Sequence, residues 1–144
     1  MGADNGRFLV ATFCDDIRQE IGKKVSLMGC YHGALMVPSL PTVLLRFCAF
    51  VSVYTPIDRP FAALELRIMH DSMVVESVEV SPDLFLPSVD VSDDSSAYMV
   101  IHTAIGFAPF SIEEPSSIYV VANTETEGEE LISQRLRILS TPSN

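Results

Sequence analysis

The sequence contains no tryptophan, only three cysteines and only nine lysine or arginine residues in 144 positions. Without tryptophan, the Cys–Trp–Cys pattern of immunoglobulin domains is excluded. Cys14, Cys30 and Cys48 form an odd set with no Cys-x-x-Cys or Cys/His pair at ligand spacing, so we expect no structural zinc site. Each cysteine lies in an apolar run, and we predict that each is a small buried residue of a protein from a reducing compartment.

Basic residues are scarce beside the 19 acidic ones, and the formal net charge is −10. This balance argues against direct binding to nucleic acid, which requires clustered lysine and arginine. It is compatible with a basic partner, or with solubility alone. The charged fraction of 19% is below the usual value of about 25%, and the mean hydropathy is +0.30. This composition favours an interface with a second copy or another protein, and a well-packed monomer is the alternative.

Long apolar runs and targeting signals are also missing. The longest apolar run, VLLRFCAFVSVY at residues 43–54, is too short to cross a bilayer and contains Arg46. The N-terminal residues MGADNGRF lack the basic and apolar regions of a signal peptide. We therefore expect a cytoplasmic protein that does not bind a membrane.

Strand-like segments dominate what is present. About eight can be marked, because apolar runs are bounded by glycine, proline and acidic turns. Residues 43–54 are apolar on both faces, as in a central strand that is covered on both sides. Residues 16–21 are compatible with a short helix or with the charged end of a hairpin that turns at residues 22–24. The segments are residues 7–14, 25–31, 33–37, 43–54, 64–68, 74–80, 97–107, 117–123 and 131–139.

This pattern predicts an antiparallel β-sandwich of about eight strands in one domain, residues 1–144, and a closed β-barrel is the alternative fold. Residues 1–6 and 141–144 are expected to be flexible termini, and residues 81–96 to be a loop.

Two strands carry finer predictions. In the strand at 74–80, Glu76 and Glu79 differ in parity, so a bulge or register change is expected. In the last strand, Ile132, Leu136 and Ile138 are expected to share one face.

Four motifs in the first part of the chain resemble a known family. They are CDDIRQE at 14–20, GKKVSLMGCY at 22–31, PSLP at 38–41 and TPIDRPF at 55–61. Together they are similar to the signature of small bacterial and phage-associated β-proteins that are classed as a domain of unknown function. The resemblance implies a bacterial or phage origin. It implies no catalytic residue, because the family has no established activity.

The densest polar group consists of Asp15, Asp16, Arg18 and Glu20, next to Cys14. A catalytic thiol would need a nearby base or cation that lowers its pKa, and no histidine is close in sequence. We interpret the four charged residues as a structural polar corner, in which Arg18 bridges carboxylates and ties two strands together.

Acidic loops are candidate binding sites. Asp90, Asp93 and Asp94, with Asp58 and Asp83 as further candidates, are possible ligands for calcium, which takes several oxygen ligands. A solvated loop is the plainer interpretation.

A second acidic segment is the hairpin tip at residues 124–130, with Glu125, Glu127, Glu129 and Glu130. These carboxylates would discourage edge pairing or dock on a basic partner. The proline-rich corner at residues 55–60 adds Asp58 and Arg59 to the candidate binding loops.

His32, His70 and His102 are scattered and would bind a metal only if folding gathered them, so neither a metal nor a cofactor is expected. The PxxP segment at residues 38–41 is interpreted as a corner between strands.

No catalytic constellation is visible at a recognisable spacing, so we expect a protein-interaction or structural module and not an enzyme. Its partner would be another protein or a second copy. The alternatives are an acidic inhibitor that occupies a nucleic-acid-binding groove of a host or phage enzyme, and a calcium-dependent ligand-binding domain. A hydrolase would require Cys14 or a serine to meet a histidine in the fold.

Overall fold

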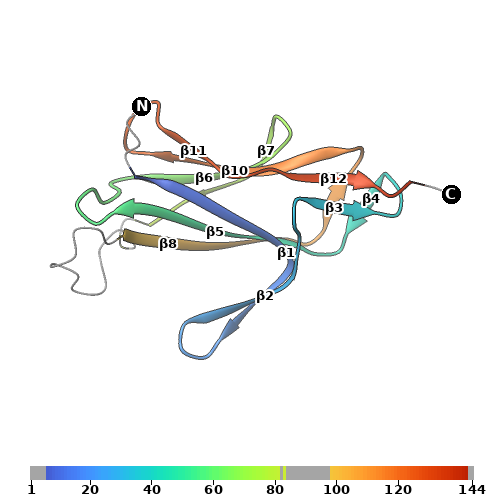
Figure 1. The fold of residues 1–144 in the computed structure, drawn as a ribbon, viewed down its shortest axis with the longest axis horizontal. Coiled ribbons are helices and arrows are strands. Elements are labelled where there is room, and N and C mark those ends of the chain that lie inside the picture. Colours follow the sequence, from blue (N-terminus) through green and yellow to red (C-terminus); the bar gives the residue numbers. More distant parts are fainter. Residues whose placement is uncertain (1–5, 82, 84–97, 143–144) are drawn as a thin grey trace.

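The computed structural model describes residues 6–81, 83 and 98–142, and β-strands make up almost all of its regular structure (Figure 1). The first sheet has four antiparallel strands. Their order is β2 (Lys24–Cys30), β1 (Phe8–Glu20), β5 (Phe47–Pro56) and β8 (Tyr98–Phe107).

The second sheet lies against the first. It runs in the order β3 (Ala34–Val37), β12 (Leu136–Ser140), β10 (Ser116–Thr124), β6 (Leu64–His70) and β7 (Met73–Glu79), and β11 (Glu130–Ile132) also pairs with β10. The pairing of β3 with β12 is parallel, and the other pairings are antiparallel. The strands β4 (Thr42–Leu44) and β9 (Phe110–Ile112) form a separate two-stranded piece.

One apolar core lies between the two sheets. In β1, β6 and β10, every second residue points into it, because successive side chains of a strand lie on opposite faces. Each fully buried large apolar side chain stabilises the fold by roughly 1.5–3 kcal/mol. The fully buried large side chains include Phe13, Phe47, Leu66, Ile68, Ile118, Val120 and Ile138.

These observations confirm the β-sandwich, since neither larger sheet closes on itself in the described part of the chain. The predicted strand count was too low, because the described residues alone form twelve strands. The segment 43–54 was predicted as one strand, but it is divided into β4 and β5. At the break Leu45 is exposed and Arg46 forms an ion pair with Asp16.

The last strand is also divided. The Val120 N–H donates to the Ser133 Oγ at 2.9 Å, and this hydroxyl donates to the Gln134 carbonyl at 2.9 Å, which interrupts the ladder between β11 and β12. As a result, Ile132 is 56% exposed while Leu136 and Ile138 are buried. The prediction that these three residues share one face was wrong.

Residues 16–20 are part of β1, so the hairpin interpretation is correct and the helix is excluded. Gly22 and Lys23 form the turn with φ of 86° and 61°. The expected register change between β6 and β7 is confirmed, at Ile68/Met69. Residues 38–41 form the corner between β3 and β4, as predicted.

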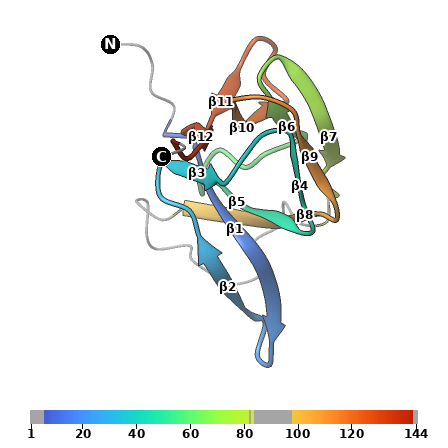
Figure 2. The same cartoon turned by 90° about the vertical axis from the view of Figure 1, so that its right-hand side faces the viewer.

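The hairpin of β1 and β2 extends beyond the sandwich (Figures 1 and 2). The pair Cys14↔Cys48 is the last between β1 and β5, so residues 15–20 pair only with β2. We call residues 15–29 the arm.

Parts of the expected loop and termini, and with them Asp90, Asp93 and Asp94, lie outside the described residues. Thr141 is held in place, because its N–H donates to the Val37 carbonyl at 2.9 Å. The described residues include no helix with the length and apolar character needed to cross a membrane.

Candidate functional site

The polar corner lies where the arm leaves the sandwich. The Arg46 Nε donates to the Asp16 Oδ1 at 2.6 Å, and the Tyr31 hydroxyl donates to the Asp15 carboxylate. The backbone N–H of Ile17 and the Arg46 guanidinium hold the pKa of Asp16 below its usual value. Arg46 therefore ties the strands together at this corner, in the role that the sequence analysis assigned to Arg18.

Arg18 and Glu20 lie farther along the arm. Arg18 is opposite Ser26, and Glu20 is opposite Lys24. The Ser26 hydroxyl donates to the Glu20 carboxylate at 2.6 Å. The four residues predicted as one corner are thus divided between the two ends of the arm.

The three cysteines form a row across the first sheet, with Cys14 directly opposite Cys30 on one side and Cys48 on the other. Cys14 and Cys48 are buried, but Cys30 is exposed because it lies on the edge strand β2, which corrects the prediction that all three are buried. Burial, followed by the neighbouring Cys48 and Cys30, raises the pKa of Cys14 to about 11. At neutral pH Cys14 is therefore protonated and a poor nucleophile.

Folding brings a serine to a histidine twice. The Ser52 Oγ is 2.8 Å from His102 Nδ1, and the Ser116 Oγ is 2.8 Å from His70 Nε2. In a nucleophilic site a third group orients the histidine. Within the described residues no carboxylate is hydrogen-bonded to either imidazole, so neither pair extends to a triad.

Each of these two rings packs on an aromatic neighbour. His102 lies 5.3 Å from Phe50 and His70 lies 5.3 Å from Phe110, measured between ring centroids. His32 is exposed beyond the end of β2. Across the described ranges, no group of three His, Cys, Asp or Glu side chains is placed to hold a metal ion.

The acidic hairpin tip is neutralised from inside by Arg7, whose side chain is fully buried. Its Nη1 donates to Glu125 at 2.7 Å and to Glu129 at 2.9 Å, and Arg59 adds an ion pair with Glu129 at 3.5 Å. Arg7 Nε also donates to the Thr55 hydroxyl at 2.9 Å. Glu125, Glu129 and Arg59 are therefore tied to one another through the start of β1.

The ion pair changes the acidity of Glu125. Partial burial is the largest influence and opposes ionisation, but hydrogen bonds from Arg7 and from the Ala62 N–H outweigh it and lower the pKa of Glu125 to about 2. Glu130 pairs with Arg67 at 3.1 Å. Asp58 and Glu127 are exposed.

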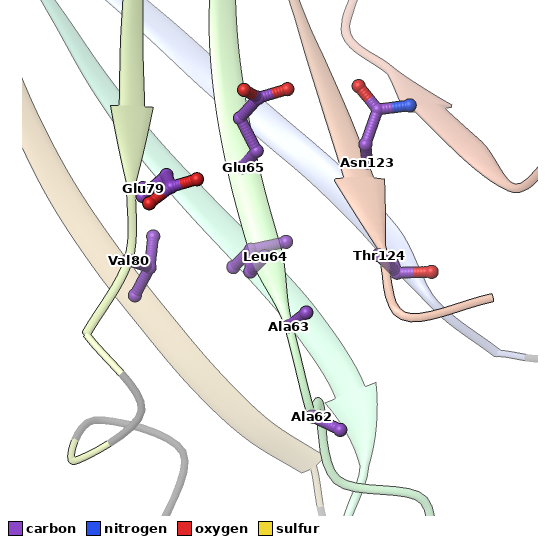
Figure 3. A pocket seen from close by; sticks show the side chains of 8 residues that line it. All are labelled: Ala62, Ala63, Leu64, Glu65, Glu79, Val80, Asn123 and Thr124. Atoms are coloured by element: carbon purple, nitrogen blue, oxygen red, sulfur yellow. The ribbon is translucent and has the colours of Figure 1, made fainter. Parts of the chain in front are cut away.

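A pocket of about 300 Å³ opens between β6, β7 and β10 (Figure 3). Its carboxylates, Glu65 and Glu79, face each other directly across the two strands, an arrangement that costs stability. The Ser77 hydroxyl donates to Glu65 at 3.2 Å, which partly offsets this repulsion. The lining contains neither a nucleophile paired with a base nor a cation, and consists of Ala62, Ala63, Leu64, Glu65, Glu79, Val80, Asn123 and Thr124.

The outer face of the first sheet differs from the rest of the surface. In β1 the residues Leu9, Ala11 and Phe13 point into the core, so the alternate residues of β5, β8 and the part of β1 that pairs with β5, residues 8–14, form the opposite face. None of these outward residues is Asp, Glu, Lys or Arg. They are Phe8, Val10, Thr12, Cys14, Cys48, Phe50, Ser52, Tyr54, Pro56, Tyr98, Val100, His102, Ala104 and Gly106.

Aromatic rings gather at one end of this face. Phe8 stacks on Tyr54 at 4.5 Å, and Tyr98 meets Phe8 edge-on at 5.6 Å. Phe8, Val10 and Tyr98 are 43%, 44% and 45% exposed. The sequence indicated this surface through the apolar outward positions of 43–54, but it predicted a second covering layer, and none of the described residues supplies one.

Comparison with known proteins adds no relative: no family model, curated protein or solved structure matches the chain. The resemblance found in the four motifs therefore stays a prediction.

Proposed function

We propose that the chain is a non-catalytic protein-interaction module whose binding surface is the outer face of the first sheet. The observation that carries this proposal is the absence of Asp, Glu, Lys and Arg from the outward positions of β5, β8 and residues 8–14 of β1, in a protein with a net charge of −10. Charged residues on this side begin only where the sheet continues into the arm, at Asp16. Elsewhere the exposed sides of strands carry charge, as Arg67 of β6 and Arg137 of β12 illustrate.

The chemistry of the face favours a protein over other ligands. The centres of protein–protein interfaces are poor in charged residues and rich in tyrosine and phenylalanine. Phe8, Tyr54 and Tyr98 supply such an aromatic group, with Val10 and Val100 beside it. A nucleic acid would require clustered basic residues on the same surface, and the outward positions of β5, β8 and residues 8–14 of β1 include none.

The strand β5 supports the same proposal from the sequence side. A strand that is apolar on both faces is typical of a sheet covered on both sides. The second sheet covers one side of β5, and a bound protein would cover the side that carries Phe50 and Tyr54. The proposal includes a cytoplasmic location, because the three cysteines are free thiols. It also includes a bacterial or phage origin, because of the resemblance in the four motifs.

A photoreactive phenylalanine analogue at position 10 tests the proposal in the organism that produces the protein. We expect one cross-linked protein partner, and we expect the Val100→Glu substitution to abolish the adduct, because it places a charge on the same face. The matched control carries the analogue at position 132, where Ile132 is exposed on the second sheet. Equal adducts at both positions, or none at position 10, would overturn the proposal.

A further inference from the structure

The arm has two chemically different faces. Phe13 points into the core, so by alternation Asp15, Ile17 and Gln19 lie on the side that continues the core face. In β2 the residues opposite Ile17 and Gln19 are Leu27 and Val25. The side that continues the core face is therefore largely apolar, and the other side carries Asp16, Arg18, Glu20, Lys24, Ser26 and Met28.

This apolar side has no covering layer among the described residues. The second sheet ends before the arm, which projects alone from the sandwich (Figures 1 and 2). Ile17, Val25 and Leu27 remain partly exposed, and Ile21 at the tip is 94% exposed. An isolated two-stranded hairpin is at best marginally stable in water, so a partner that covers the apolar side would stabilise it.

Charge is distributed unevenly along the arm. At the root, Arg46 neutralises Asp16, while Asp15 is hydrogen-bonded to an uncharged tyrosine hydroxyl. Toward the tip, three basic residues (Arg18, Lys23 and Lys24) outnumber one acidic residue (Glu20), which gives +2. Since the whole chain is −10, the remainder is −12, and the tip is a basic site on an acidic protein.

We infer that two copies of the chain associate by clasping their arms, apolar side against apolar side and in opposite directions. In this arrangement Lys23, in the turn at the tip of each arm, lies near Asp15 at the root of the other, while Arg18 and Lys24 lie on the outward side. The pair of Ile17 and Leu27 of one arm packs on Val25 and Ile21 of the other. Both contacts occur twice, as in any interface made by the same patch on two subunits.

A second copy fits this surface better than an unrelated protein for a specific reason. From root to tip, each arm carries an acidic residue, then apolar residues, then basic residues. Two arms therefore match in charge only when they run in opposite directions. Opposite charges at both ends also fix the register of the two arms. The inference does not require the proposed function, because the arm and the outer face of the first sheet are separate surfaces.

Sedimentation velocity over a wide range of protein concentrations tests the inference. We expect a monomer–dimer equilibrium, and no larger species, because the two-fold clasp is closed. The substitution Lys23→Glu should weaken the dimer at least tenfold, and so should raising the salt concentration, whereas Lys24→Glu on the outward side should have a smaller effect. Ile17→Asp should abolish the dimer, with circular dichroism to check that the sandwich is retained.

The control variant is Met73→Asp, which adds a charge at the hairpin of β6 and β7 on the second sheet, where Met73 is 69% exposed. It should leave the dimer unchanged, as should Val10→Glu on the outer face of the first sheet. A wild-type monomer at all concentrations would overturn the inference. A dimer that resists the arm substitutions but is lost with Val10→Glu would overturn it too, and would assign self-association to the outer face.

Discussion

Replacing Arg7 with methionine should destabilise the fold strongly. The guanidinium is fully buried, and it donates to Glu125, Glu129, Thr55 and the carbonyls of Arg59 and Pro60. Methionine would fill the space of the aliphatic stem but would leave two carboxylates and two carbonyls without this donor. Removing one partner of a buried ion pair typically costs about 3–5 kcal/mol, and we expect a loss in this range.

Urea unfolding monitored by circular dichroism would measure this loss. At about 2.1 cal/mol/K of unfolding entropy per residue, the same change corresponds to a drop in Tm of roughly 10–16 °C. Arg7 lies over the ring of Phe61 at 4.5 Å, and Arg135 lies over the ring of Tyr119 at 3.9 Å but is exposed, so Arg135→Met is the matched control. It should cost about 1 kcal/mol or less.

A double-mutant cycle with Glu125→Gln separates the ion pair from the packing of the stem. If the pair dominates, the cycle should give a coupling energy of about 1–3 kcal/mol. A loss below about 1 kcal/mol for Arg7→Met, no larger than for Arg135→Met, would refute the reasoning and show that the network contributes no net stability.

Three further predictions concern acidity, thiol exposure and backbone geometry. The pKa of Glu125 falls from 4.5 to about 2 on folding. A shift of this size corresponds to at most about 3 kcal/mol, and solvent screening of the partly exposed carboxylate reduces it. This contribution is present above about pH 4.5 and is lost as the pH falls toward 2, so Glu125→Gln should flatten this part of the curve of unfolding free energy against pH. Iodoacetamide should label the exposed Cys30 in the folded protein and should reach the buried Cys14 and Cys48 only after unfolding. Peptide mass spectrometry would identify the labelled residues, and labelling of Cys14 before Cys30 would contradict the structure. Gly29→Ala should destabilise the fold by about 1 kcal/mol more than Gly33→Ala, as measured by thermal unfolding. Both glycines have positive φ, but only at Gly29 would an added Cβ overlap the Asp15 carboxylate. Equal losses for the two variants would exclude that overlap.

The sandwich could be predicted because the signals for strands are local. Alternation in residues 64–68 and turn residues at 22–24 act over a few positions, and both appear in the structure as expected. The apolar character of residues 43–54 on both faces also indicated the outer face of the first sheet. What the sequence did not indicate is the break at Arg46, because the residue that holds it, Asp16, is 30 positions away.

The interactions at the candidate sites were harder to predict for the same reason. Arg7 and Glu125 are 118 positions apart, so no local pattern joins the first strand to the acidic hairpin tip. The cysteine row depends on the register of three strands, and a shift of one residue would move Cys30 away from Cys14. The basic tip of the arm was not predicted either, because it became visible only when the structure showed that Lys23 and Lys24 lie at the end of a projecting hairpin.

The parallel pairing of β3 with β12 has a consequence for synthesis on the ribosome. Ala34 pairs with Arg137, so the ribosome must add about a hundred residues after β3 before the partner strand β12 has been synthesised. At about 5–20 residues per second, that delay is roughly 5–20 s. During this time the apolar faces of β1 and β5 are already synthesised but lack the completed second sheet. The sandwich is therefore completed only after β12 has been synthesised, and the need of the nascent chain for chaperones should exceed that of a domain whose strands pair in order.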